Sequence, residues 1–295
     1  MIFLYLNTPL DTGKLKINYK ILEIESLKKL CQFIECELTD YDAVNKSLEI
    51  LIEHYNILNA TYELNGPLFR ARKINSNPFN HVRELSAPPA EITPANRLNL
   101  ANDPVMYLAQ NMLSAFDEIH AKDNNIIQLM IYETELKYSP KVALIGEIKS
   151  VFRTGKAIYS DMIADHINQT LKEFILSEKS YFNSYVYTDS FINKILTDKD
   201  AKKKNYITTQ SLFKLIRKKH PHINGIVYEG ISSQGAKNLV ITTNCSENFL
   251  IPKKSMIIKI VKSHGFGLYD YEVLNRSLYI KSNGNIVWEK INQPL

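Results

Sequence analysis

The sequence has little cysteine, little glycine and one tryptophan, and it has no long hydrophobic run. Its 295 residues include three cysteines and ten glycines, and 45% of them are hydrophobic. No segment approaches the roughly 18 consecutive apolar residues of a membrane-spanning helix, so we expect no membrane partner. The composition also excludes a collagen-like repeat and a wholly disordered chain. The length fits one large domain or two small ones.

Neither sign of charge dominates, because 36 basic side chains stand against 31 acidic ones and give a formal net charge of +5. Such a balance permits a nucleotide-phosphate or polyanion partner without requiring one. The basic runs 202–204 and 217–219 have no nucleic-acid-binding motif beside them. We therefore expect them to be solvated surfaces and do not expect a nucleic-acid partner.

The three cysteines, Cys31, Cys36 and Cys245, form an odd set whose spacing does not fit a zinc site. We expect reduced thiols in a cytoplasmic protein. The apolar opening from Met1 to Leu6 follows no basic segment, so we expect no secretory signal. The stretch His220-Pro221-His222 lacks a third ligand nearby and favours a helix-ending turn over a metal site.

The sequence pattern changes near residues 65–67. Before this point, helical spacing of apolar residues predicts two helices within 15–60, with a turn between them at 38–40 and Asp40 or Asp42 as a cap of the second helix. After it, residues 68–74 alternate as a strand does, and residues 75–104 form a loop that holds five of the eleven prolines. We expect an N-terminal helical extension over 1–66 and an α+β domain over 67–295. The other predicted elements are helices over 112–121, with Ser114 as a candidate cap, over 157–177 and over 208–219, a helical or mixed segment over 181–196, and strands over 105–109, 126–133, 142–145, 225–228, 238–242 and within 256–290.

Three side chains with complementary chemistry follow one another on a loop, a strand and a helix. Arg97 is a permanently charged donor fork that suits a phosphate or pyrophosphate. Tyr107 offers an aromatic face to a flat ring, and Glu118 offers a carboxylate. Taken singly, each has an ordinary explanation: a solvated arginine, a packing tyrosine, and a glutamate paired with Lys122.

Four short motifs surround these residues in order, and together they resemble the RES domain, which is named for arginine, glutamate and serine. The family pattern is Gly-Arg-aromatic-Asn, Pro-Val-x-Tyr-x-Ala, Ala-x-x-Glu and Gly-Ile-x-Tyr-x-Ser, followed by Asn before a hydrophobic strand. The resemblance covers about 67–245 and includes the arginine-bearing strand 68–72. The matching segments are Asn96-Arg97-Leu98-Asn99, Pro104-Val105-Met106-Tyr107-Leu108-Ala109, Ala115-Phe116-Asp117-Glu118 and Gly225-Ile226-Val227-Tyr228, with Asn238 before Leu239.

The resemblance implies an ADP-ribosyltransferase-like split β-sheet with flanking helices. It implies that NAD⁺ is a substrate whose nicotinamide–ribose bond is cleaved by phosphorolysis or hydrolysis, with inorganic phosphate as a possible second substrate and no metal. It also implies a bacterial toxin that works in the cytoplasm with a cognate antitoxin, as a homo-oligomer or as a toxin–antitoxin complex.

Site residues follow from the same resemblance. Glu118 would be the central carboxylate, Arg97 would hold the phosphates, and Tyr107 would line the nicotinamide–ribose pocket. A gapless match puts Gly230 in place of the family serine, whereas a shifted match selects Ser232 or Ser233. The residues assigned to NAD⁺ binding are Arg70, Arg72, Arg97, Tyr107, Tyr228, Ser233 and Asn238, and those assigned to catalysis are Glu118, Arg97, Tyr107 and Ser232.

Three alternatives stay open on the sequence. One is transfer of ADP-ribose to a macromolecule from the same cleft. Another is a non-catalytic nucleotide-binding module, which Gly230 in the serine position favours. The last is a basic nucleic-acid-binding protein, which would bind DNA or RNA in a salt-sensitive way.

Overall fold

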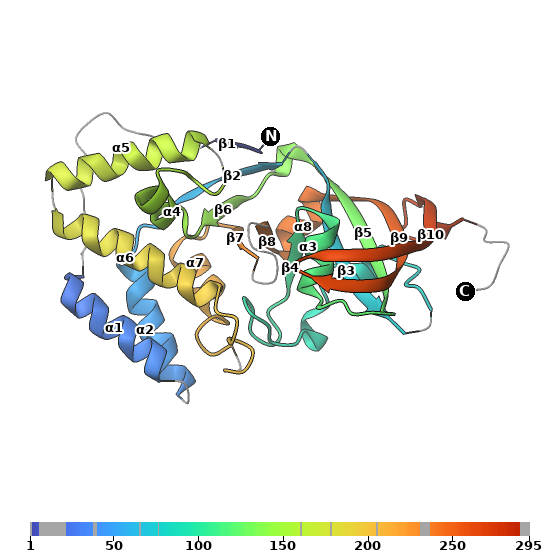
Figure 1. Cartoon of the computed structure of the whole chain (residues 1–295), viewed down its shortest axis with the longest axis horizontal. Helices are drawn as coiled ribbons and strands as arrows, with labels where there is room; N and C mark the ends of the chain where they lie inside the picture. The colour runs from blue at the N-terminus through green and yellow to red at the C-terminus, as the bar shows by residue number, and fades with distance from the viewer. Residues whose placement is uncertain are drawn as a thin grey trace. The chain divides into compact units, whose positions relative to one another are not determined.

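The computed structural model describes residues 2–5, 22–37, 40–64, 66–75, 77–159, 161–177, 179–204, 206–230 and 237–289. The chain forms two compact units and passes between them several times (Figure 1). Unit 1 comprises Met1–Glu63, Pro94–Ala101 and Pro140–Tyr228, and unit 2 comprises Leu64–Thr93, Asn102–Ser139 and Glu229–Leu295. The first change of unit lies close to the expected boundary at residue 66, but the chain later returns to unit 1 twice. Both helices and strands are present in number, in agreement with the predicted α+β class.

Unit 1 combines a small sheet with a layer of helices. The strands follow the order β1-β2-β6-β7, in which β2 and β6 are antiparallel and β6 and β7 are parallel. The strands are β1 (Ile2–Tyr5), β2 (Asn59–Leu64), β6 (Lys141–Leu144) and β7 (Gly225–Glu229). The helices are α1 (Ile24–Cys36), α2 (Tyr41–Glu53), α4 (Glu147–Thr154), α5 (Asp161–Ser177), α6 (Lys179–Leu196) and α7 (Leu212–Lys219).

The two predicted N-terminal helices are confirmed as α1 and α2. Each buries an apolar stripe, for which Leu27 and Leu48 are examples at 1% and 0% exposure. The predicted cap is Asp40, whose side chain accepts a hydrogen bond from the Ala43 amide at 3.0 Å. At the other end of α2, the Lys219 ammonium group donates to the main-chain carbonyls of Ile52, Glu53 and Tyr55 at 2.6–2.9 Å. The predicted turn before α2 includes residues 38–39, which lie outside the described residues.

A buried carboxylate on α6 caps the N-terminus of α4, a helix that was not predicted from the sequence. Asp189 accepts hydrogen bonds from the main-chain amides of Gly146 and Lys149 at 3.0 and 2.9 Å and from the Tyr55 hydroxyl at 2.9 Å. These two amides lie at the start of α4, where helix N–H groups have no partner within the helix. Burial raises the pKa of Asp189 above its ordinary value, although all three donors oppose that shift.

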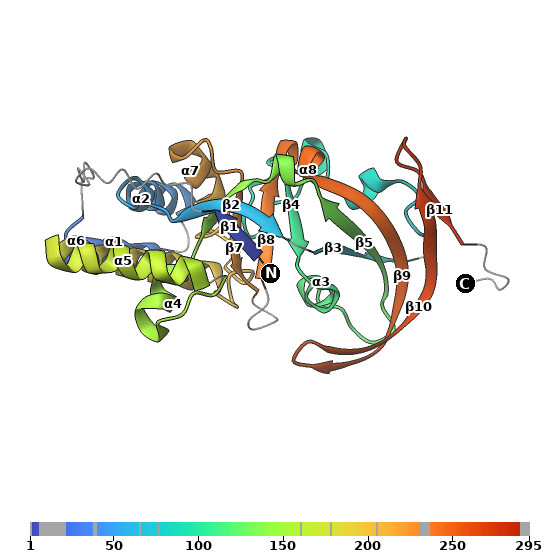
Figure 2. The same ribbon diagram turned by 90° about the horizontal axis from the view of Figure 1, so that it is seen from above.

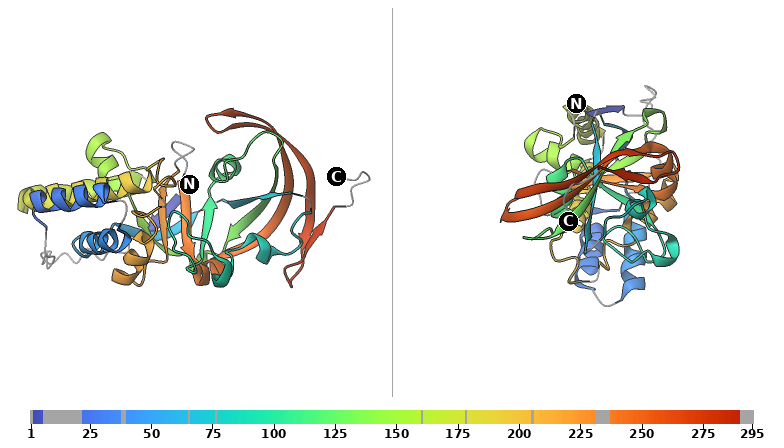
Figure 3. Two further views of the ribbon diagram at one scale, coloured as in Figure 1. Left: turned by 90° about the horizontal axis from the view of Figure 1, so that it is seen from below. Right: turned by 90° about the vertical axis from the view of Figure 1, so that its right-hand side faces the viewer.

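Unit 2 contains a strongly curved antiparallel sheet in the order β8-β4-β3-β5-β9-β10-β11. Helix α3 lies inside the curve formed by β5, β9 and β10 (Figures 2 and 3). The strands are β3 (Leu68–Ile74), β4 (Val105–Ala109), β5 (Ile126–Thr134), β8 (Lys237–Thr242), β9 (Leu250–Gly265), β10 (Leu268–Ile280) and β11 (Ile286–Trp288). The helices are α3 (Met112–Glu118) and α8 (Thr243–Phe249), with short 3-10 turns η1 (Val82–Leu85), η2 (Ala90–Ile92) and η3 (Leu136–Tyr138).

The core of unit 2 fills the space between α3 and the concave face of the sheet. Phe116 is fully buried there against Ile127, Leu129 and Ile258. At about 25 cal/mol per Å² of buried apolar surface, such contacts stabilise the placement of α3 by several kcal/mol. The end of α3 is therefore held close to the sheet.

Most predicted elements of unit 2 are confirmed, including β3 and β4 over the residues expected, but α3 differs in two ways. It ends at Glu118 rather than at residue 121, because His120 adopts a left-handed backbone with φ of 49°. Its cap is Asn111, whose side chain accepts from the Ser114 amide at 2.8 Å, and not Ser114 as expected. Helix α8 was not predicted at all.

Two general expectations can be compared with the described part of the chain. No helix in it is long and apolar enough to cross a membrane. All three cysteines are free thiols, and burial raises the pKa of Cys31 to about 12 and that of Cys245 to about 11. At neutral pH these two sulfurs are protonated, which makes them weak nucleophiles.

Candidate functional site

The candidate site of unit 2 is centred on Glu118, the last residue of α3. The Asn238 amide nitrogen donates to Glu118 Oε1 at 2.5 Å. Because α3 ends at Glu118, Lys122 lies beyond the helix, and the two residues are not neighbours on successive turns of one helix. Instead, a residue 120 positions later in the chain holds the carboxylate.

Strand register explains why Asn238 and Tyr107 accompany Glu118. In the β4–β8 ladder, Ala109 lies opposite Asn238 and Tyr107 lies opposite Val240. Paired residues share a face of the sheet, and residues two apart on a strand share it too. Ala109 packs in the core beneath α3. Tyr107 and Asn238 therefore lie on the face that α3 covers, together with Glu118.

Asn238 is 3% exposed and has one amide oxygen still to satisfy. Its nitrogen is bonded to Glu118, whereas its Oδ1 is buried and has no hydrogen-bond partner among the described residues. Buried polar atoms of this kind usually have a partner, so an unsatisfied oxygen beside a carboxylate is a natural place for a ligand hydroxyl or a water. Tyr107 is half-buried and supplies the aromatic wall of the same face.

Arg70 lies where the sheet of unit 2 opens. Over the described strands, β3 and β4 are paired at Phe69 and Ala109 alone. Arg70 alternates with Phe69 and Ala71, which pack in the core beneath α3, so its side chain extends from the other face of the sheet. Its Nη1 lies 3.3 Å from both the Tyr107 carbonyl oxygen and the Met106 sulfur. Burial and the neighbouring Arg72 lower the pKa of Arg70 to about 10, so it stays charged at neutral pH.

The Arg72 side chain is bonded to the long loop between β3 and β4. Its Nη2 donates to the Ser86 carbonyl at 3.3 Å, at the end of η1. Nearby, the Tyr132 hydroxyl donates to the Leu85 carbonyl, and the fully buried Gln128 side chain bonds both main-chain groups of Phe79. The long loop between β3 and β4 is thus fastened to the sheet. Among the described residues no carboxylate forms an ion pair with Arg70 or Arg72, so their charge is available to an anion.

Arg97 belongs to unit 1, unlike the other two residues of the predicted triad. Its Nη1 donates to the carbonyls of Leu196 and Asp198 at 3.0 and 3.1 Å, just where α6 ends, and its guanidinium lies over the Tyr206 ring at 5.5 Å. These contacts fix the Arg97 side chain within unit 1. They make one of its roles structural, because a cation satisfies the free carbonyls at a helix C-terminus.

The last predicted site residues divide between the two units. Tyr228 is 2% exposed on β7 of unit 1, where its ring packs in the core. Gly230, which stands in the serine position of a gapless match, is buried. Ser232 and Ser233 lie outside the described residues, so both assignments of the family serine stay predictions.

No protein-family model matches this chain. A search of curated proteins also finds no match. The RES-domain resemblance therefore depends on the short sequence motifs alone.

The histidine pair near residue 221 does not form a metal site with the residues that the structure describes. Helix α7 ends at Lys219, which confirms the predicted helix-ending turn at His220-Pro221-His222. The described residues contain no group of three or more histidine, cysteine, aspartate or glutamate side chains that could hold a metal ion.

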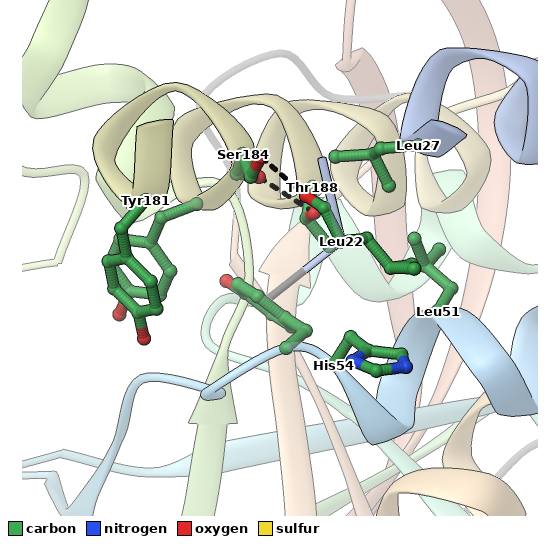
Figure 4. Close-up of a pocket in the computed structure, with 9 residues that line it drawn as sticks. Leu22, Leu27, Leu51, His54, Tyr181, Ser184 and Thr188 are labelled. Carbon is green, nitrogen blue, oxygen red and sulfur yellow. Dashed lines mark hydrogen bonds between the residues drawn. The ribbon is translucent and has the colours of Figure 1, made fainter. Parts of the chain in front are cut away.

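A pocket within unit 1 contains none of the predicted site residues. Its walls are mainly aromatic and aliphatic, with Tyr181 and Tyr185 stacked at 5.9 Å between ring centroids. Its serine and threonine hydroxyls are already used: Ser184 donates to the Leu22 carbonyl and Thr188 to the Ser184 carbonyl, both at 2.8 Å (Figure 4). The Ser184 and Thr188 hydroxyls are therefore already committed to main-chain carbonyls.

Proposed function

We propose that this chain consumes NAD⁺ by breaking the bond between nicotinamide and ribose. The observation that supports the proposal most is the group formed by Glu118, Asn238 and Tyr107 on one face of the unit 2 sheet. Asn238 lies 120 positions after Glu118 in the sequence, and the RES-like motifs select all three residues. We further propose that unit 2 belongs to an ADP-ribosyltransferase-like catalytic domain.

The chemistry needs few groups. Cleavage of a glycosidic C–N bond builds positive charge on the ribose, as in glycoside hydrolysis. A fixed carboxylate stabilises that charge more strongly in the transition state than in the ground state. Nicotinamide departs as a neutral molecule, so no strong general acid is required. Glu118 supplies the carboxylate in this scheme, and water or inorganic phosphate attacks the anomeric carbon.

The other side chains bind and orient the substrate. Tyr107 provides a flat apolar wall for the nicotinamide ring. Asn238 holds Glu118 through its nitrogen, and its buried oxygen can accept a hydrogen bond from a ribose hydroxyl. Arg70 extends from the opposite face of the sheet to these three side chains, so its role in holding the phosphates stays a prediction of the family resemblance. NAD⁺-binding roles for Arg72, Arg97, Tyr228 and Ser233, a catalytic role for Ser232, and a cytoplasmic toxin with an antitoxin partner stay predictions of the family resemblance.

Incubation with NAD⁺ labelled in the ADP-ribose portion tests the proposal and separates the alternatives. Free nicotinamide with ADP-ribose indicates hydrolysis, and ADP-ribose 1″-phosphate that appears only with added phosphate indicates phosphorolysis. Label retained on protein or nucleic acid would instead identify a transferase. Binding of NAD⁺ without any product would identify a non-catalytic module and overturn the proposed activity.

A further inference from the structure

The carboxylate next to Glu118 in the sequence is buried, and it is bonded to β10 rather than to β8. Asp117 is 6% exposed, and its Oδ1 accepts a hydrogen bond from the Tyr269 hydroxyl at 2.6 Å. The Tyr269 side chain comes from β10, at the tip of the hairpin that β9 and β10 form. A hydroxyl bonded to a carboxylate at this distance is a strong, charge-assisted contact.

The surroundings of Asp117 make this contact hard to replace. Its second oxygen, Oδ2, is buried and has no hydrogen-bond partner among the described residues. Gly267 lies so close that a Cβ on it would be 3.2 Å from Oδ2, and its φ of +76° already disfavours any other residue. Burial raises the pKa of Asp117, and the Tyr269 hydroxyl opposes that rise. The carboxylate is thus enclosed, with Tyr269 as its one described donor.

Two more contacts fix the same end of α3. The Tyr269 ring packs edge-on against the buried Phe116 ring, with centroids 5.7 Å apart. The Lys73 ammonium group donates to the His120 carbonyl at 2.8 Å, just beyond the helix. Helix α3 has seven residues, too few to be stable without such contacts. Glu118 is its last residue, where a helix otherwise frays.

We propose that Tyr269 is a positioning residue, which holds Glu118 in place by fixing Asp117 and with it the end of α3. Because Asp117 and Glu118 are adjacent, movement of one peptide unit moves both side chains. The hairpin of β9 and β10 would then act as a brace for the candidate site, although it contributes no group to it. The effect on catalysis rests on the proposed function, whereas the effect on α3 does not.

The test compares Tyr269→Phe with Tyr271→Phe in the full chain. Tyr271 is the matched control: it lies two residues away on β10, its ring also packs on Phe116 at 6.0 Å, and it is 40% exposed. The first readout is hydrogen–deuterium exchange of peptides that cover 112–121. We expect about tenfold faster exchange in Tyr269→Phe and unchanged exchange in Tyr271→Phe, since removal of the hydroxyl leaves a buried carboxylate without its donor.

The second readout is nicotinamide release from NAD⁺. We expect kcat to fall about tenfold in Tyr269→Phe with KM unchanged, because misplacement of a catalytic carboxylate affects the chemical step more than binding. Asp117→Asn retains an acceptor for Tyr269 and should fall less than Tyr269→Phe. Equal hydrogen–deuterium exchange of these peptides in Tyr269→Phe and Tyr271→Phe would contradict the proposed positioning role of Tyr269. If the wild-type chain releases no nicotinamide, the proposed function fails, and exchange alone still decides whether Tyr269 fixes α3.

Discussion

Replacement of Glu118 by glutamine separates the chemical role of this residue from its structural role. Glutamine has nearly the same shape and retains an oxygen that can accept from the Asn238 amide, which now donates at 2.5 Å. A hydrogen bond to a neutral acceptor is worth about 1 kcal/mol less than one to a charged acceptor. We therefore expect the free energy of unfolding to fall by about 1 kcal/mol and the fold to be retained.

The effect on catalysis should be much larger. Two unit charges about 4 Å apart attract each other by about 4 kcal/mol at an effective dielectric constant of about 20. Loss of that attraction in an oxocarbenium-like transition state corresponds to about a 10³-fold lower rate, at about 1.36 kcal/mol for each factor of ten. The assay is nicotinamide release under saturating NAD⁺, with urea unfolding of the same preparation.

The matched control is Glu133→Gln. Glu133 is an exposed glutamate on β5 of the same unit, where it forms a surface ion pair with Lys253 at 2.9 Å. The control should leave both the rate and the unfolding curve unchanged. Nicotinamide release by Glu118→Gln at the wild-type rate would refute this prediction, because Glu118 is the one carboxylate proposed to stabilise the positive charge on the ribose.

The remaining predictions concern unit 1. Arg97→Ala should lower the free energy of unfolding by about 1–3 kcal/mol through the two lost carbonyl contacts; it should also weaken NAD⁺ binding in calorimetry, and unchanged affinity would contradict the predicted phosphate role. Lys219→Met should cost about 1–2 kcal/mol in urea unfolding because it uncaps α2, whereas the exposed neighbour Lys218→Met should cost nothing measurable. Since the pKa of folded Asp189 is raised, its contribution to stability is greatest below about pH 4 and decreases as pH rises through the folded pKa. The stability of wild type relative to Asp189→Asn should therefore decrease from pH 4 to pH 7, and a difference that stays constant or grows would contradict the assignment.

The sequence was informative where local pattern decides structure. Alternation of apolar and basic residues placed β3 correctly, and helical spacing of apolar residues identified α1 and α2. These elements are determined by periods of two and 3.6 residues, which are visible in one sequence. Strand β4 was also placed correctly, although its residues do not alternate with polar ones.

The elements that were missed depend on partners far along the chain. Helix α4 starts at a left-handed Gly146 and is capped by Asp189 from α6, a contact between residues 43 positions apart. No sequence pattern within residues 146–154 indicates that cap. The short α8 follows a strand directly, with Thr242 as its cap, and seven residues give too little periodicity to recognise.

The candidate site shows the same division. The RES-like motifs selected Glu118, Tyr107 and Asn238, but the hydrogen bond between Glu118 and Asn238 results from the pairing of β8 with β4. Neither the buried Asp117 nor Tyr269 stood out, because an aspartate within a helix and a tyrosine within a strand usually face solvent or core. A signal for Tyr269 was the Gly-Phe-Gly turn at 265–267, which allows the hairpin tip to approach α3 closely.

The central claim is that this chain cleaves the nicotinamide–ribose bond of NAD⁺, and the rate of nicotinamide release by the purified wild-type chain tests it most directly. We predict release that is proportional to protein concentration and to time, and that falls about 10³-fold in Glu118→Gln. Intact NAD⁺ after prolonged incubation, both with and without phosphate, from a chain that unfolds cooperatively in urea would contradict it.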